Sequence, residues 1–473
     1  MNGPVVALAA ALGLALPACS LAPRYHRPAL PDPPSTYKES GDWQRAMPAD
    51  AQPRGPWWQM FGDEELNDLE AQVHADNQSL KAALARLGQA RATTRVARAD
   101  WLPTLTANVN ADRARTSVNS PTYAPGRPAT GNLFSAGVDL SYELDLFGRI
   151  RSNVAAARFG EQASAGDVAA LELSLHAELA TDYFSLRGLD VQQGLLDRTV
   201  ADYTRALELT RNLHTGGAVA LSDVQQAEAQ LQSARTQAED TRLRRAQTEH
   251  AIAVLIGKPA SAFILAARAE AGLPRLQGVD PGLPSQLLER RPDVAAAERR
   301  VASANAGIGV ARAAYFPVFT LGGSAGVEST APGSWLTAPS RFWSLGPQAL
   351  LTLFDAGRHA GESQRAHAVY DEQVANYRDT VLRAYQEVED NLAALRQLQR
   401  ERQSQEGAVQ ATQGALDQAL LRYRGGIVTY LEVVATENAA LTARLTAVDI
   451  DVRRASALVL LIRALGGDWR AAS

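Results

Sequence analysis

The sequence contains little of what several functional classes require. Its single cysteine, Cys19, excludes an intrachain disulfide and a metal centre built from cysteines. The seven histidines are scattered without the spacing of metal ligands, so no metal site is predicted. A net charge of −4 without a basic face gives no indication of nucleic-acid binding. Beyond residue 20, no stretch of about twenty residues is apolar and uncharged. This argues against a membrane-spanning helix and leaves strands as the means of membrane insertion.

The start of the chain is typical of a secretion signal. Residues 5–16 form a short apolar run that leads into Leu-Pro-Ala-Cys-Ser at residues 16–20. A cysteine in this place is similar to a bacterial lipoprotein signal, whose thiol receives a diacylglyceryl group before cleavage. We therefore predict a signal peptide over residues 1–18, covalent N-acyl diacylglycerol on Cys19, and a lipidated, proline-rich tether over 19–62. A plain signal peptide with an incidental cysteine is the alternative.

The two halves of the chain are copies of each other. From residue 144 to 258 the first copy maps onto the second at a constant offset of 209, as in Gly148/Gly357 and Gly217/Gly426. Upstream the offset is 214, as in Pro103/Pro317. Chance similarity between helices does not account for the pattern, because glycines and prolines coincide as well. The repeat is too long for a solenoid unit. It predicts a duplicated domain-sized unit over residues 63–258 and 285–473, joined by a linker over 259–284.

Within each copy the hydrophobic period changes from helix to strand and back. In the first strand Leu105, Ala107 and Val109 alternate with polar residues. The first copy predicts a helix over 63–101, a β-hairpin over 103–147, a proline-free helix over 149–215 and a returning helix over 221–256. The second copy predicts the same order over 292–315, 317–355, 358–424 and 430–465. Four strands are too few for a closed transmembrane barrel, which needs about eight, so a barrel would have to be shared between chains.

Short motifs in a consistent order and spacing resemble the TolC-like outer-membrane efflux family over residues 20–470. They are Trp57-Trp58, Leu80-Lys81-Ala82-Ala83, Leu102-Pro103, the octapeptide from Tyr142 to Arg149, Arg290-Arg291-Pro292-Asp293, Phe354-Asp355-Ala356-Gly357-Arg358 and Tyr423-Arg424-Gly425-Gly426. The lipoprotein signal and the proline-rich tether are similar to the NodT lipoprotein branch of that family.

The resemblance implies a mainly α fold with a membrane β part. Three chains would share one 12-stranded β-barrel in the bacterial outer membrane, and a long antiparallel coiled-coil α-barrel would extend into the periplasm. The implied function is the exit duct of a tripartite RND-type efflux system, which passively conducts drugs or other small toxic compounds to the exterior. The implied partners are two further copies of the chain, a periplasmic adaptor (membrane fusion) protein, an inner-membrane RND transporter and outer-membrane lipid.

The resemblance also implies a gate at the helix tips. By position, Tyr423 matches the family's tip tyrosine, and Asp223 matches the aspartate with which that tyrosine can bond. Leu431 matches an apolar constriction residue, and Glu432 lies where some members carry a first pore aspartate. Ala435 lies where they carry a second one, so this sequence departs from the pattern and one acidic ring is missing.

The turns between the long helices are predicted to face the adaptor, through Gly216, Gly217, Gly425 and Gly426. Each of these assignments has a simpler structural alternative. Glu432 can be an exposed charge that complements the helix dipole, Tyr423 can be a packing residue, and the glycines can serve left-handed backbone geometry.

The sequence leaves three alternatives to an efflux duct. The same fold can serve as the outer-membrane channel of a type I protein secretion system, and a coiled-coil envelope protein would have no pore. An esterase is suggested only by the Gly-Gly-Ser-Ala-Gly string at residues 322–326. A nucleophile elbow needs a strand-to-helix turn, whereas this string lies inside an alternating strand. No catalytic residue, no metal and no further cofactor is predicted.

Overall fold

The computed structural model describes residues 21–30, 38, 56–121, 123, 124, 126, 128–269 and 291–467. Cys19, the predicted signal peptide, most of the predicted tether and residues 270–284 of the predicted linker lie outside the described residues. The chain divides into two compact units, each of which draws on both copies of the repeat. Unit 1 comprises Met1–Ala29, Arg86–Ala165 and Ala296–Arg378, and unit 2 comprises Leu30–Ala85, Gly166–Ala295 and Asp379–Ser473.

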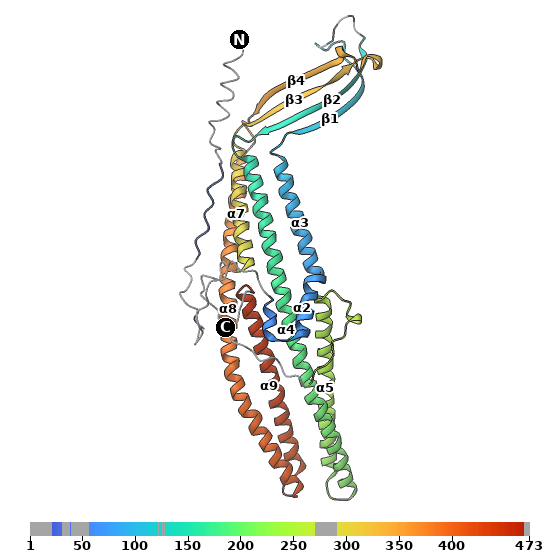
Figure 1. Ribbon diagram of the computed structural model, residues 1–473, viewed down its shortest axis with the longest axis vertical. Helices are drawn as coiled ribbons and strands as arrows, with labels where there is room; N and C mark the ends of the chain where they lie inside the picture. Colours follow the sequence, from blue (N-terminus) through green and yellow to red (C-terminus); the bar gives the residue numbers. More distant parts are fainter. Residues whose placement is uncertain are drawn as a thin grey trace. The chain divides into compact units, whose positions relative to one another are not determined.

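Unit 1 contains one antiparallel four-stranded sheet (Figure 1). Its strands, in spatial order, are β1 (Thr104–Arg115), β2 (Thr130–Leu144), β3 (Val318–Ser329) and β4 (Arg341–Leu350). Both predicted hairpins are confirmed, and the pairing of β2 with β3 joins them, with Val138 opposite Ala325. Strands β1 and β4 are exposed along their length, and no strand of the described chain pairs with their outer edges.

The long helices form two pairs that match in length between the copies. Helices α4 (Arg149–Thr215) and α8 (Arg358–Arg424) have 67 residues each, and α5 (Leu221–Leu255) and α9 (Tyr430–Ala464) have 35 each. Their ends lie within a residue of the predicted bounds, because missing prolines and flanking glycines determine them locally. At the α-helical rise, each 67-residue helix extends for about 100 Å.

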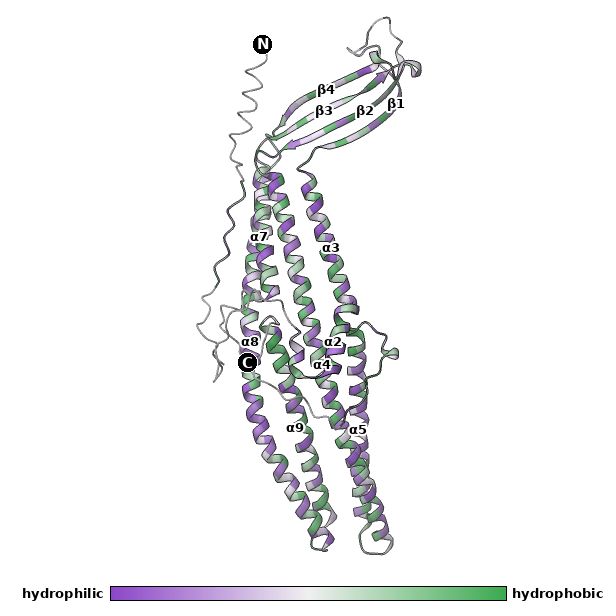
Figure 2. Ribbon diagram, viewed as in Figure 1, coloured by the Kyte–Doolittle hydropathy of each residue, from purple (hydrophilic) through white to green (hydrophobic). Residues whose placement is uncertain are grey.

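The remaining helical elements are shorter. They are η1 (Trp57–Phe61), α2 (Glu64–Asp76), α3 (Gln78–Ala99), η2 (Ala260–Ala262), α7 (Pro292–Ala313), η3 (Pro332–Ser334) and η4 (Ala338–Ser340). Hydrophilic and hydrophobic residues are interspersed along the long helices (Figure 2). In the part of the chain that the structure covers, no helix is both apolar enough and long enough to pass through a membrane.

Several of the largest buried side chains of unit 2 come from α2, α4 and α5. Leu66, Tyr183, Phe184 and Ile252 have no exposed surface, and the Phe184 ring meets the Phe61 ring edge-on at 4.8 Å. Full burial of one such side chain contributes roughly 1.5–3 kcal/mol. The Tyr183 hydroxyl donates to a carboxylate oxygen of Asp63 at 2.6 Å, which satisfies its polar end inside this core.

A buried ion network fixes the same elements to one another. Arg187 on α4 donates to Asp190 at 2.7 Å and also pairs with Glu65 at the start of α2. Arg245 on α5 donates to the other oxygen of Asp190 at 2.6 Å and to the carbonyl of Leu265 at 2.6 Å. Buried charges are tolerated only when they are paired and hydrogen-bonded, and here each carboxylate meets a guanidinium. The network therefore fixes the relative positions of α2, α4 and α5.

The prediction of one continuous helix over residues 63–101 is wrong at Asn77. This residue is extended (φ −60°, ψ 124°) and separates α2 from α3. Its side-chain oxygen accepts from the N–H of Leu80 at 2.9 Å, which caps α3. Its side-chain nitrogen donates to the carbonyl of Leu255 at 2.7 Å. The second partner lies 178 residues away, so the local hydrophobic period could not reveal the break.

We expect Asn77→Ala to lower the free energy of unfolding by about 1 kcal/mol or more, because it removes a helix cap and orphans a buried carbonyl. Thermal unfolding followed by circular dichroism measures the change. Ser79→Ala, at an exposed position of the same helix, is the control. Equal melting temperatures for both variants would contradict this role of Asn77.

Candidate functional site at the helix tips

The turns that join α4 to α5 and α8 to α9 have the same backbone geometry. Gly217 and Gly426 have positive φ angles of 78° and 69°. In the first turn the N–H of Gly217 donates to His214 and that of Ala218 to Leu213, at 2.8 and 2.9 Å. In the second turn Gly426 donates to Tyr423 and Ile427 to Arg422, both at 2.9 Å. This pattern is a Schellman motif, which ends a helix at a left-handed residue.

The turn geometry accounts for one glycine of each predicted pair. Gly217 and Gly426 are the left-handed residues, whereas Gly216 and Gly425 have no positive φ. The chain reversal therefore requires Gly217 and Gly426 whether or not a partner binds there. The predicted contact of these turns with an adaptor stays a prediction.

An apolar cluster holds the two hairpins together near the turns. Its buried members come from α4, α5, α8 and α9: Tyr203, Leu207, Ala227, Leu231, Ala234, Ala419, Tyr430, Val433 and Val434. Asn438 on α9 adds polar links, since it accepts from the Tyr203 hydroxyl at 3.2 Å and donates to Gln230 at 3.0 Å. The hairpins of the two copies thus pack against each other within one chain.

Tyr423 packs against the edge of this cluster and lies within electrostatic reach of Asp223. Its ring centroid is 5.6 Å from that of Tyr430. Partial burial raises the pKa of Tyr423, and the negative charge of Asp223 raises it further. No hydrogen bond joins Tyr423 to Asp223 among the described residues. The structure therefore places the predicted pair in one neighbourhood, and the predicted bond between them stays a prediction.

Glu432 and Leu431 lie in the first turn of α9. Glu432 accepts from Arg422 at 2.8 Å, and both side chains are about half exposed, at 43% and 50%. Such a pair contributes about 0.2–1 kcal/mol, but it links the end of α8 to the start of α9. Arg422 was not predicted, because nothing in the sequence shows that it faces Glu432 across the turn. Leu431 is 60% exposed, so the described residues leave most of its apolar side chain uncovered.

Asp223 and Glu432 occupy equivalent positions in the two copies. Both are the third residue of the returning helix, and their N–H groups donate to Ala220 at 3.1 Å and Thr429 at 3.2 Å. Each charge complements the dipole at its helix N-terminus. Glu432 has Arg422 beside it, whereas the position equivalent to Arg422 in the first copy is Leu213. The same acidic position therefore has an arginine beside it in the second copy and a leucine at the equivalent place in the first.

A second acidic pair, which the sequence did not single out for function, also differs between the copies. Glu228 pairs with Arg211 at 2.5 Å, whereas Glu437 has Leu420 at the position equivalent to Arg211. One carboxylate oxygen of Glu437 is buried without a hydrogen-bond partner in the described structure. Burial, and then the charge of Asp202, raise the pKa of Glu437 to about 7.

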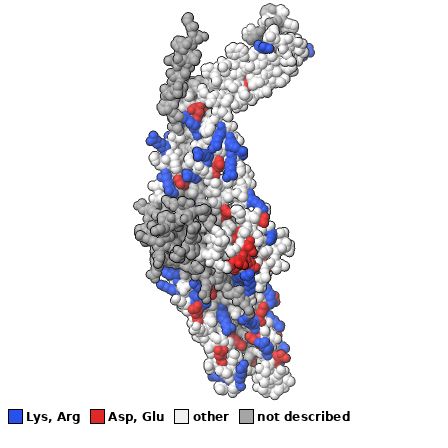
Figure 3. Space-filling model, viewed as in Figure 1, with Lys and Arg blue, Asp and Glu red and all other residues white. Residues whose placement is uncertain are grey.

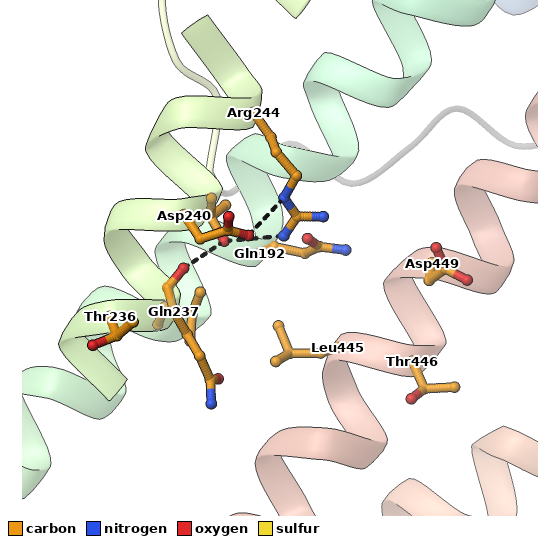
Figure 4. A pocket seen from close by; sticks show the side chains of 10 residues that line it. Gln192, Thr236, Gln237, Asp240, Arg244, Leu445, Thr446 and Asp449 are labelled. Atoms are coloured by element: carbon orange, nitrogen blue, oxygen red, sulfur yellow. Dashed lines mark hydrogen bonds and ion pairs between the residues drawn. The ribbon is translucent and has the colours of Figure 1, made fainter. Parts of the chain in front are cut away.

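A groove lies between α4, α5 and α9 in unit 2 (Figure 4). It has a volume of about 580 Å³, and its polar lining includes Gln192, Gln237 and Thr446. Asp240 and Asp449 are repeat equivalents on α5 and α9, and Arg244 pairs with Asp240 at 3.0 Å. Among the described residues no group of three or more histidine, cysteine or acidic side chains could hold a metal ion. This mixed lining lacks the predominantly hydrophobic and aromatic character of a typical small-ligand pocket.

The Gly-Gly-Ser-Ala-Gly sequence at residues 322–326, considered above as a possible nucleophile elbow, lies inside β3, as expected. The Ser324 hydroxyl is hydrogen-bonded to the Ser344 hydroxyl on β4 at 2.7 Å.

On the face shown in Figure 3, charged side chains of both signs cover the helices and few lie over the strands.

Comparison with known proteins defines the class of this chain. The outer membrane efflux protein family matches residues 70–258 and 283–467. The chain therefore belongs to that family and is an outer-membrane exit duct of an efflux system, with long helices that extend into the periplasm.

Relatives match over nearly the whole length. The chain is 34% identical to the outer membrane protein OprJ of Pseudomonas aeruginosa, over 99% of this chain and 97% of OprJ. It is 30% identical to the cation efflux system protein CusC of Escherichia coli, over 97% and 98%. The outer membrane channel CmeC of Campylobacter jejuni has a similar structure, with a TM-score of 0.89, 25% identity and 95% coverage of each chain.

We expect Gly426→Ala to lower the free energy of unfolding of the tip by about 1–2 kcal/mol, because a side chain at positive φ is strained. Gly425→Ala, one residue earlier with no positive φ, is the matched control and should be neutral or mildly stabilising. Hydrogen exchange of the α8–α9 turn reports the difference. Equal exchange rates for the two variants would argue against the requirement of the turn for glycine at position 426.

We expect Glu437→Gln to stabilise the protein in a pH-dependent way. The folded-state pKa is raised from the usual 4.5 to about 7, so the wild type loses stability as the pH rises through that window. The gain in melting temperature should be largest at pH 8, shrink below pH 7 and vanish near pH 4.5. Glu228→Gln removes the arginine-paired equivalent and should give no gain at pH 8. A gain in melting temperature that does not depend on pH would refute the raised pKa of Glu437 as its cause.

Proposed function

We propose that three copies of this chain close one duct through the outer membrane, with a periplasmic adaptor and an inner-membrane RND transporter as partners. The observation that carries this proposal is the sheet with two open edges, β1 and β4. A closed membrane barrel needs about eight or more strands, and one chain contributes four. Three chains bring twelve strands and leave no edge unpaired.

The cargo is a small compound that the duct conducts passively. The relatives' names specify diverse cargoes: toluene for TtgF and antibiotics for ArpC, both of Pseudomonas putida, and pyoverdine for OpmQ of Pseudomonas aeruginosa. The chain is 32–34% identical to each of them. One scaffold with such different cargoes supports a duct whose selectivity is set by its transporter. The small size of these cargoes favours efflux over protein secretion.

The tips of the hairpins form the gate of this duct. Tyr423 and Asp223 lie together there, the apolar side chain of Leu431 is uncovered, and Arg422 links the end of α8 to Glu432. In a trimer, Asp223 and Glu432 would each occur three times at equivalent positions. The gate loosens when the polar and electrostatic links between neighbouring helices are removed. Cys19 carries the lipid that anchors the N-terminus in the same membrane.

We expect Tyr423→Phe combined with Asp223→Ala to raise the single-channel conductance of purified trimers in planar bilayers severalfold over the wild type. The same pair of changes away from the tip, Tyr370→Phe with Asp371→Ala on α8, should leave conductance unchanged. A trimer that conducts in neither form would refute the duct. Conductance equal to that of the wild type in both variants would refute only the gate.

A further inference from the structure

The helices that lead into β1 and β3 end in the same way. After α3 the N–H of Trp101 donates to the carbonyl of Arg98 at 3.1 Å, and after α7 the N–H of Tyr315 donates to that of Arg312 at 3.2 Å. The two pairs are equivalent in the repeat at the offset of 214. We call Arg98 with Trp101 the first junction and Arg312 with Tyr315 the second junction. Each junction between helix and strand therefore carries an arginine and, three residues later, an aromatic residue.

The side chains of both junctions are open to their surroundings. The aromatic residues Trp101 and Tyr315 are 47% and 48% exposed, and both arginines are exposed. Neither junction arginine has a hydrogen-bond or ion-pair partner among the described residues. By contrast, Arg149, which begins the helix after β2, donates to both carboxylate oxygens of Glu143 at 2.7 and 2.8 Å. The junction arginines are therefore available to a ligand from outside the described chain.

The open edges of the sheet do not cause this exposure. The second junction precedes β3, an inner strand that pairs with β2 on one side and with β4 on the other. Chains that join at the edges β1 and β4 give β3 no further neighbour in the sheet. Arg312 and Tyr315 are thus exposed where both neighbouring strands are already in place. Because the copies are equivalent, we expect the same setting for Arg98 and Trp101.

The first junction is continuous with a row of positive charge on α3. Arg91, Arg95 and Arg98 follow one another at intervals of four and three residues, so they share one face of the helix, and all three are exposed. Helix α3 contains no acidic residue. Of the three arginines, only Arg91 meets a carboxylate among the described residues, that of Glu161 at 4.0 Å. The end of α3 therefore carries a net positive charge.

In the second copy the corresponding face of α7 is covered by the chain itself. Asn305 and Gly309 stand at the positions equivalent to Arg91 and Arg95. Asn305 donates to a backbone carbonyl of the N-terminal segment, at residue 23, at 2.9 Å. A Cβ atom on Gly309 would lie 2.6 Å from the Cβ of Ala22. This face of α7 thus has its ligand within the chain, whereas the described residues leave the equivalent face of α3 exposed.

The position of each arginine along α3 determines which of them can meet a membrane. In the proposed duct the strands lie in the membrane and the helices extend into the periplasm. The headgroup layer of a bilayer is roughly 5–8 Å deep on each side. At the helical rise, Arg95 lies about 4.5 Å and Arg91 about 10 Å further from the sheet than Arg98. Arg95 and Arg98 can therefore reach the headgroup layer, and Arg91 lies beyond it.

We propose that the two junctions bind the phosphate groups of anionic phospholipids in the periplasmic leaflet of the outer membrane. Arg98 and Arg95 are the ligands at the first junction and Arg312 at the second, because a guanidinium can bind two phosphate oxygens at once. The rings of Trp101 and Tyr315 lie at the level of the headgroups, where aromatic side chains with a polar group are favoured. The net positive charge favours an anionic headgroup over a zwitterionic one. This proposal rests on the proposed insertion of the strands.

The double variant Arg95→Gln with Arg98→Gln tests the proposal. The matched control is Arg86→Gln with Arg91→Gln, which removes the same charge from exposed positions of the same helix, further from the sheet. Native mass spectrometry of the purified, detergent-solubilised protein measures the binding of dioctanoyl phosphatidylglycerol and of dioctanoyl phosphatidylcholine. The wild type should prefer phosphatidylglycerol. The test variant should lose about tenfold or more in its affinity for this lipid, because each arginine near anionic headgroups contributes to binding. The control should bind like the wild type.

A charge-conserving variant, Arg95→Lys with Arg98→Lys, should keep most of the preference, which separates loss of charge from misfolding. Equal affinity of the glutamine variant and the wild type would overturn the proposal, as would an equal loss in the control. Excess inorganic phosphate should not displace the lipid, and complete displacement would identify a site for free anions instead. Conductance in phosphatidylcholine bilayers reports the duct without this lipid, so a failure of the duct would be recognised separately.

Discussion

The outer edges of β1 and β4 impose the constraint on which the rest of the molecule depends. Each edge presents a row of N–H and C=O groups that finds no partner among the described strands of its own chain. In a membrane each unpaired group costs several kcal/mol, so an open edge cannot stay in hydrocarbon. In the proposed trimer, pairing with neighbouring copies removes this cost. The unpaired edges therefore indicate that the four-stranded sheet of one chain is part of a larger assembly.

Duplication supplies this assembly with a scaffold that occurs twice, and the two copies have kept what the backbone requires. Gly217 and Gly426 make the same turn, and Asp223 and Glu432 occupy the same place after it. Side chains have diverged where the two copies meet different neighbours. Leu420 stands at the position equivalent to Arg211, so Glu437 lacks the arginine that pairs with Glu228, and Gly309 stands at the position equivalent to Arg95, where Ala22 packs closely. Residues that are the same in both copies therefore mark positions that the backbone geometry requires. Residues that differ mark positions where each copy makes its own contacts.

Stability is distributed unevenly along the helices. In the ion network of Arg187, Asp190 and Arg245, both oxygens of the buried Asp190 carboxylate are paired with a guanidinium, and the network ties α4 to α5. Near the turns the apolar cluster is accompanied by the partly buried and unpaired carboxylate of Glu437 and the exposed ion pair of Arg422 with Glu432. Elements that move in a gate are drawn from the less stable parts of a structure. The tips, where the gate is proposed, have fewer paired and fully buried groups than the centre of unit 2.

The sequence by itself determined the duplication, the strands and the ends of the four long helices, because alternation, missing prolines and glycine turns act between residues close in the chain. It also placed the tip residues Tyr423, Asp223, Leu431 and Glu432 at the turns, although not their contacts. Only the tertiary structure decided the break at Asn77, the pairing of β2 with β3, the unpaired oxygen of Glu437 and the packing of residues 22–29 against α7 and α8. Each of these depends on partners that lie far apart in the chain, such as Asn77 with Leu255 or Pro23 with Asn305. No local pattern encodes such contacts, because they form only when packing brings distant segments together.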